Sequence, residues 1–263
     1  MEFLLHILAG ATVGFAIGLT GVGGGSLMTP LLLVFGYPAP VAIGTDLLYA
    51  AITKAGGAIT HHRQGNVNWK IVFLLAAGSI PVSILLHAFF LDANFQESPE
   101  FESLLTFSLG IMLIITAIIL IFRDKMRQNA IEQRPEFFML SIHRHRFAVT
   151  WIMGLLLGIC VTLSSVGAGA FGAAILLTIY TQISAVKVIG TDIAHAVPLT
   201  FIAGMGYLFS GFVDMVLLVS LLIGSLPAIH IGSKLSSRVP DKILQRILTV
   251  VLLGLGGYYS LAS

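Results

Sequence analysis

Ten apolar stretches follow one another along the chain, and their lengths restrict the fold more than any other feature. They cover residues 3–19, 26–36, 41–60, 69–91, 103–122, 147–163, 173–181, 188–209, 215–233 and 243–261. About 17 or more apolar residues in a helix cross the roughly 30 Å hydrocarbon core of a bilayer. With 57% hydrophobic and 10% charged residues, the sequence predicts an all-α polytopic membrane protein. The stretches 26–36 and 173–181 are too short to cross unless they are helically extended or re-entrant.

The two halves of the sequence repeat one design at an offset of 146 residues. The offset lays "GVGGGSLMTPLLLVFGYPAPVAIGTD" (21–46) over "GAGAFGAAILLTIYTQISAVKVIGTD" (167–192), and the tetrapeptide IGTD coincides. The same register matches Gly65 with Gly211, and an offset of 144 matches Gly14 with Gly158 in the first segments. Shared apolar composition alone would not align loop glycines. Each half is therefore predicted to contain about five hydrophobic segments.

Basic residues concentrate in three regions and predict how the chain is oriented. These regions are 61–70, 123–146 and 234–246, whereas 92–102 and 210–214 contain no lysine or arginine. Short loops rich in lysine and arginine stay in the cytoplasm. The matched loops of the two halves then lie on opposite faces, so the repeats are predicted to be inverted.

The predicted organisation has three parts in a cell membrane. A first transmembrane repeat covers 1–122, a cytoplasmic linker covers 123–146, and a second, inverted repeat covers 147–263. Both termini are predicted to be external, whether each short segment spans or is re-entrant.

Glycine-rich stretches precede both short segments. Residues 20–25 read "TGVGGG" and residues 164–172 read "SSVGAGAFG". Non-helical chain at membrane depth survives only where it is buried or lines a cavity, and the helix that follows directs free N–H groups and a positive dipole end toward an anion. Close packing of helices is the alternative role of such glycines. The predicted substrate-binding residues are Thr20, Gly21, Gly23, Gly24, Gly25, Thr45, Lys54, Ser164, Ser165, Gly167, Gly169 and Thr191.

Among the ionisable residues inside apolar stretches, the candidates for function are Asp46, Lys54, Asp192 and His195. Each is costly in hydrocarbon and is expected to face a partner or a cavity. Asp46 and Asp192 occupy the same repeat position, and proton coupling and helix capping are the two roles considered for them and for His195. Lys54, whose counterpart is Thr200, could supply one positive charge to a bound anion; an ion pair or a snorkelling side chain is the alternative.

Several function classes find no support in the sequence. The net charge of +2 is spread without a basic block, so nucleic acid is not an expected partner. No sequence motif for metal or nucleotide binding and no nucleophile with an attendant base is evident. We therefore expect no enzymatic activity, no metal and no cofactor.

The sequence resembles the TauE/SafE sulfite exporter family. The first half carries "GFAIGLTGVGGGSLMTPLLLVFGYPAPVAIGTDLL" followed by "HRQGNV", and the second carries "GTD", "SGFVD" and "IGSLPAIHIGSKLSSRVPDKILQRILTVVLLGLG". The residues that match the family's glycine motif are Thr20, Gly21, Gly23, Gly24, Gly25, Pro30, Gly44 and Thr45. The resemblance implies an inner-membrane permease that moves sulfite, sulfoacetate or related organosulfonates, usually outward.

These observations together favour a secondary transporter that works by alternating access, with a small anion held between the two glycine breaks. An anion channel of similar architecture and a permease for another small anion, such as a carboxylate, are the alternatives. The expected partners are the small anion and the lipid bilayer, and the sequence leaves homo-oligomerisation open.

Overall fold

A computed structural model describes residues 2–20, 27–89, 98–131, 145–167, 169–180, 182–235 and 241–262. Within these ranges the chain forms ten α-helices and no β-strand. In chain order they are α1 (Glu2–Thr20), α2 (Met28–Val34), α3 (Ala39–Arg63), α4 (Trp69–Phe89), α6 (Pro99–Ile131), α8 (Arg146–Ser164), α9 (Ala170–Ile179), α10 (Ala185–Phe209), α11 (Met215–Leu235) and α12 (Asp241–Ala262).

The lengths of these helices confirm the predicted all-α, polytopic membrane fold. Five of them, namely α4, α6 over Pro99–Phe122, α8, α10 and α11, are long and apolar enough to cross a membrane. The short helices α2 and α9 contain 7 and 10 residues, which corresponds to about 10 and 15 Å. Neither short helix is long enough to cross a bilayer by itself.

The distribution of polar and apolar side chains suits a lipid environment. Phe73, Phe89 and Phe209 are each more than two-thirds exposed, whereas Asp46 and Asp192 are almost completely buried. Large apolar side chains on the outside need no water-excluding partner when the surroundings are lipid. Ionisable side chains in the interior then mark the functional part of a membrane protein.

Helices from different halves of the chain pack through glycines. Gly158 of α8 lies against Ser79 of α4, and a Cβ atom there would approach Ser79 O to 2.5 Å. The repeat counterparts make the same contact, since a Cβ atom at Gly14 of α1 would approach Ser225 Cα of α11 to 2.6 Å. These glycines allow close approach of two backbones, which is the alternative role considered for glycine, here within the helices.

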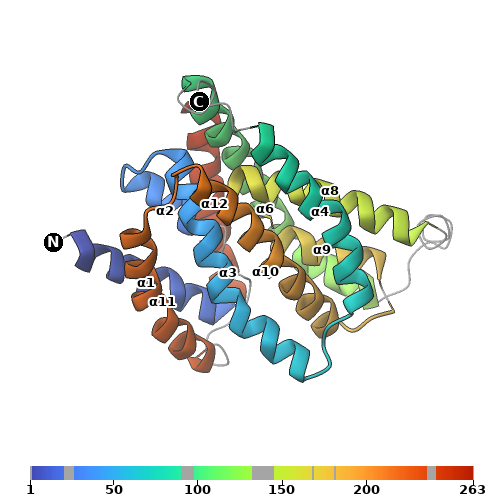
Figure 1. Ribbon diagram of the computed structural model, residues 1–263. Coiled ribbons are helices and arrows are strands. Elements are labelled where there is room, and N and C mark those ends of the chain that lie inside the picture. Colours follow the sequence, from blue (N-terminus) through green and yellow to red (C-terminus); the bar gives the residue numbers. More distant parts are fainter. Residues whose placement is uncertain are drawn as a thin grey trace.

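The middle helices of the two halves, α3 and α10, run side by side in opposite directions (Figure 1). Gly44, near the start of α3, lies against Tyr207, near the end of α10. Gly190, near the start of α10, lies in turn against His61, near the end of α3. Because equivalent helices are antiparallel, the two halves are related as inverted repeats, as predicted.

The linker is described only at its two ends. Helix α6 continues to Ile131, which is inside the predicted linker 123–146, and α8 begins at Arg146. The domain boundaries at 122 and 147 stay predictions.

Candidate functional site

The second glycine break is a buried interruption between α8 and α9. Helix α8 ends at Ser164, and Ser165 then adopts a left-handed conformation with φ of 57°. Gly167 and Gly169 follow with φ of 117° and 118°, values that strongly favour glycine. Ser164 and Ser165 are both buried. The chain therefore leaves helical geometry inside the bundle and restarts a helix there, as the sequence predicts.

The first glycine break lies outside the described residues. Gly21, Gly23, Gly24 and Gly25 belong to it, and the side chain of Thr20 is likewise not described. Helix α1 ends at Thr20 and α2 begins at Met28. The predicted role of these five residues in binding stays a prediction.

Asp46 faces the beginning of the short helix α2. It lies inside α3, whose N-cap is Pro38, so it does not cap its own helix. Instead its Oδ2 accepts hydrogen bonds from the backbone N–H of Thr29 at 3.2 Å and from the hydroxyl of Thr29 at 2.5 Å. A carboxylate at this position complements the positive end of the α2 dipole. Ser165 also lies near Asp46, although its hydroxyl makes no hydrogen bond of normal geometry within the described ranges.

Asp192 faces the beginning of the other short helix, α9. Its carboxylate lies directly against the Cα of Gly172, where a Cβ atom would collide with it. The backbone of Gly169 is also near, but neither oxygen of Asp192 has a hydrogen-bond partner of normal geometry among the described residues. The repeat counterpart of Thr29 is Ile175. Because the isoleucine side chain cannot replace the hydroxyl that bonds Asp46, the Asp192 carboxylate is less firmly held than that of Asp46.

Lys54 lies between the two carboxylates, close to the pseudo-two-fold axis. It is 7% exposed and interacts electrostatically with both, more strongly with Asp192 than with Asp46. Leu48 of α3 packs against Gly204 of α10. Because the two helices are antiparallel and equivalent residues are 146 positions apart, equivalent residues lie opposite each other about five positions after Leu48. The pseudo-two-fold axis passes through this point. Lys54 is therefore the cation at the centre of symmetry, between the beginnings of α2 and α9.

Thr45 and Thr191 join the two repeats to each other. Thr45 Oγ1 accepts a hydrogen bond from Asp214 N at 3.3 Å, and Thr191 Oγ1 accepts one from Asn68 N at 2.9 Å. Asp214 and Asn68 are themselves repeat counterparts. The two hydroxyls thus fasten the start of each middle helix to a loop of the opposite repeat.

His195 contacts a different helix from the one that carries Asp192. Its Nε2 lies 2.8 Å from Ser79 Oγ on α4, and its buried Nδ1 has no hydrogen-bond partner among the residues described. The counterpart of His195 is Tyr49, which faces Ser225, the counterpart of Ser79. In both repeats, an aromatic residue at this position thus lies against a serine.

Ser164 donates from Oγ to Cys160 O at 2.6 Å and therefore closes the end of its own helix.

The structure also brings in residues that the sequence did not single out. Thr29 bonds Asp46, Gly172 makes room for Asp192, and Ser79 bonds His195. The alignment of the repeats gives one sequence signal for the role of Thr29, because a polar residue in the first repeat is matched with the apolar Ile175 in the second. Among the residues that the structure describes, no group of three or more His, Cys, Asp or Glu could hold a metal ion.

Comparisons with known proteins identify one family and several membrane transporters. The family model described as "Sulfite exporter TauE/SafE" matches residues 6–259. The probable membrane transporter protein YjnA of Bacillus subtilis is 38% identical over 94% of this chain and 95% of its own length. YdhB of the same organism is 30% identical over 96% and 98%, and MJ0441 of Methanocaldococcus jannaschii is 28% identical over 99% and 97%. Both are also described as probable membrane transporter proteins. No solved structure matches the chain.

Proposed function

Since the chain belongs to the TauE/SafE sulfite exporter family, we propose that it is a secondary transporter of small sulfur-containing anions. It is a membrane transporter by family, and its relatives are described as transporters rather than as enzymes. The substrates that we propose are sulfite, sulfoacetate or related organosulfonates, and the proposed direction is export. The proposed orientation has both termini outside the cell and the linker in the cytoplasm.

The observation that carries the proposal is the buried lysine at the pseudo-two-fold axis. Lys54 lies between the starting ends of the two short helices, and each of those ends meets one carboxylate. A small anion beside Lys54 would gain the attraction of the ammonium group and of two helix N-termini. Inverted repeats allow the same centre to open to either face by rearrangement of one repeat against the other.

The two carboxylates make the charge of this centre dependent on protons. With both carboxylates and Lys54 ionised, the centre carries one net negative charge, which would repel an anion. Anion binding is therefore favoured when one carboxylate is protonated. We assign this proton to Asp192, because its oxygens have no hydrogen-bond donor of normal geometry in the part of the chain that the structure describes, whereas Asp46 is held by Thr29.

The remaining predicted residues take supporting roles in this proposal. The proposed walls of the anion site consist of Thr20, Ser165 and the glycines of both breaks. Thr45 and Thr191 join the two repeats through their bonds to the opposite loops. Ser164 closes the end of α8, and His195 positions α4 through Ser79.

The proposal is tested by counterflow of radiolabelled sulfite in proteoliposomes that contain the purified protein. A carrier gives saturable uptake that is accelerated by unlabelled sulfite inside the vesicles and is inhibited by sulfoacetate. Uptake that rises linearly with concentration, together with large single-channel conductance, would establish a channel instead. Counterflow with small carboxylates but not with sulfite would contradict the proposed substrate class.

A further inference from the structure

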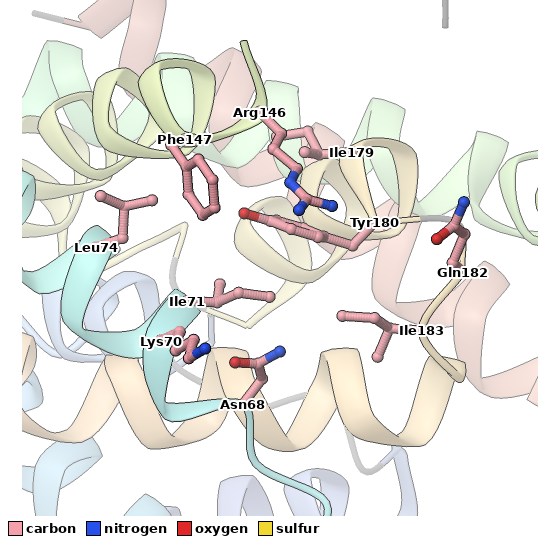
Figure 2. Close-up of a pocket in the computed structure, with 10 residues that line it drawn as sticks. All are labelled: Asn68, Lys70, Ile71, Leu74, Arg146, Phe147, Ile179, Tyr180, Gln182 and Ile183. Atoms are coloured by element: carbon pink, nitrogen blue, oxygen red, sulfur yellow. The ribbon is translucent and has the colours of Figure 1, made fainter. Parts of the chain in front are cut away.

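A second polar feature lies at one end of the bundle, away from Lys54. A cavity of about 210 Å³ is bordered by the start of α4, the start of α8 and the segment between α9 and α10 (Figure 2). Two cations, Lys70 and Arg146, line it together with the amides of Asn68 and Gln182. Figure 2 shows Arg146 and Lys70 on opposite sides of Tyr180. None of the described residues that line the cavity is a carboxylate, so its lining attracts anions.

The positive charge of this cavity has no equivalent at the matching positions of the other repeat. In an inverted repeat, the equivalent positions of the two halves lie at opposite ends. The counterparts of Asn68, Lys70 and Arg146 are Asp214, Val216 and Glu2. The basic cavity therefore breaks the symmetry of the repeat. A difference of this kind is expected where a transporter receives an anion at one face and releases it at the other.

Two elements that border the cavity also contact the central residues. Asn68, which lines the cavity, donates its backbone N–H to the hydroxyl of Thr191 at 2.9 Å, and Thr191 precedes Asp192. Helix α9 makes a second connection, because Ile179 lines the cavity while Gly172 lies against Asp192. From Gly172 to Ile179 is about 10 Å along the helix. An anion in the cavity is thus about two helical turns from the central site.

We propose that this cavity is a collecting site for small oxyanions at the predicted cytoplasmic face. The inference rests on the proposed function and adds to it an entry position and a sidedness. Lys70 and Arg146 attract the anion, the amide of Gln182 can donate to its oxygens, and the apolar wall accommodates the carbon atoms of an organosulfonate. The anion then moves along α9 to Lys54. Because both cations are exposed, their effect is screened by salt.

The first test measures the charge of the cavity independently of any transport. Gln182→Cys is introduced after the single cysteine is replaced by Cys160→Ser. The thiolate at residue 182 attacks a methanethiosulfonate, forms a mixed disulfide and releases methanesulfinate. The ratio of rates for a reagent with a sulfonate group and for neutral methyl methanethiosulfonate reports the local potential. We expect the ratio to fall about five- to tenfold when Lys70→Gln and Arg146→Gln are added.

The matched control is Lys234→Gln, which removes an exposed cation at the end of α11, in another region predicted to be cytoplasmic. It should leave the ratio unchanged. A ratio that is the same with and without Lys70 and Arg146 would overturn the proposal. A ratio that falls equally in the control would also overturn it, because the effect would then come from general surface charge.

The second test measures sulfite uptake into everted membrane vesicles, in which the predicted cytoplasmic face is outside. Removal of both cations should raise KM about five- to tenfold at low salt and leave kcat unchanged. At 1 M salt, where the Debye length is about 3 Å, the difference should disappear. An unchanged KM at low salt would overturn the collecting role. If the unmodified protein moves no sulfite, the proposed function fails, while the labelling ratio still decides whether the cavity concentrates anions.

Discussion

Replacement of Lys54 by methionine tests the proposed centre most sharply. Methionine has about the same length and fills the same space, but it removes the positive charge. An anion about 4 to 6 Å from the ammonium group gains about 3 to 4 kcal/mol at an effective dielectric constant of about 20. Each 1.4 kcal/mol corresponds to a factor of ten in affinity. Lys54→Met should therefore raise KM for sulfite at least about 100-fold in proteoliposomes.

The same substitution should also lower the stability of the fold. Lys54 interacts with two buried carboxylates, and removal of one partner from a buried charge group typically costs about 3 to 5 kcal/mol. Asp46 is eight residues away on α3, about 12 Å along the helix axis. Its attraction to Lys54 therefore contributes about 1.4 kcal/mol of the expected loss in stability. The larger share should come from Asp192. We expect the double variant with Asp192→Asn to recover most of the lost thermal stability and none of the sulfite affinity.

Two variants serve as controls. Lys54→Arg keeps the charge and should retain sulfite transport, and Lys234→Met removes an exposed lysine and should change neither KM nor the melting temperature. If Lys54→Met leaves KM for sulfite within about twofold of the unmodified protein, Lys54 does not contact the anion and the proposed centre is wrong.

Three further predictions concern neighbouring parts of the structure. Asp192→Asn should make the rate of sulfite counterflow insensitive to pH, and a retained pH profile would remove Asp192 as the proton site. Asp46→Ala should lower the free energy of unfolding by about 2 to 4 kcal/mol, since it leaves two buried donors of Thr29 without their acceptor; an unchanged melting temperature would contradict this. Gly172→Ala should abolish counterflow, because the added Cβ atom collides with the Asp192 carboxylate. Gly57→Ala should be tolerated, because its Cβ atom makes an ordinary contact of 3.8 Å. Equal activity of the two variants would refute the steric argument.

The sequence was sufficient to predict the fold class and the inverted repeat. Apolar length and composition predict spanning helices directly, because the bilayer sets both requirements. The offset of 146 residues, with matched loop glycines, predicts equivalent helices, and the antiparallel packing of α3 and α10 agrees. The glycines at 167 and 169 indicated a break, and their positive φ values show one.

The partners of the polar residues could not be predicted in the same way. That Thr29 bonds Asp46 depends on the rotation of the short helix α2 about its axis, which a segment with apolar residues on every side does not encode. Lys70 and Arg146 are far apart in sequence, and each fits the general excess of basic residues at a cytoplasmic face. Only the packing of α4 beside α8 puts them around one cavity.

The most direct measurement is the position of the bound anion in a cryo-electron microscopy map of the protein in a lipid nanodisc with saturating sulfoacetate. We expect density for the sulfonate group within about 4 Å of the ammonium group of Lys54, between the starting ends of α2 and α9. Side chains packed against one another around Lys54, with sulfoacetate density only elsewhere, would contradict a central anion site at the axis between the repeats.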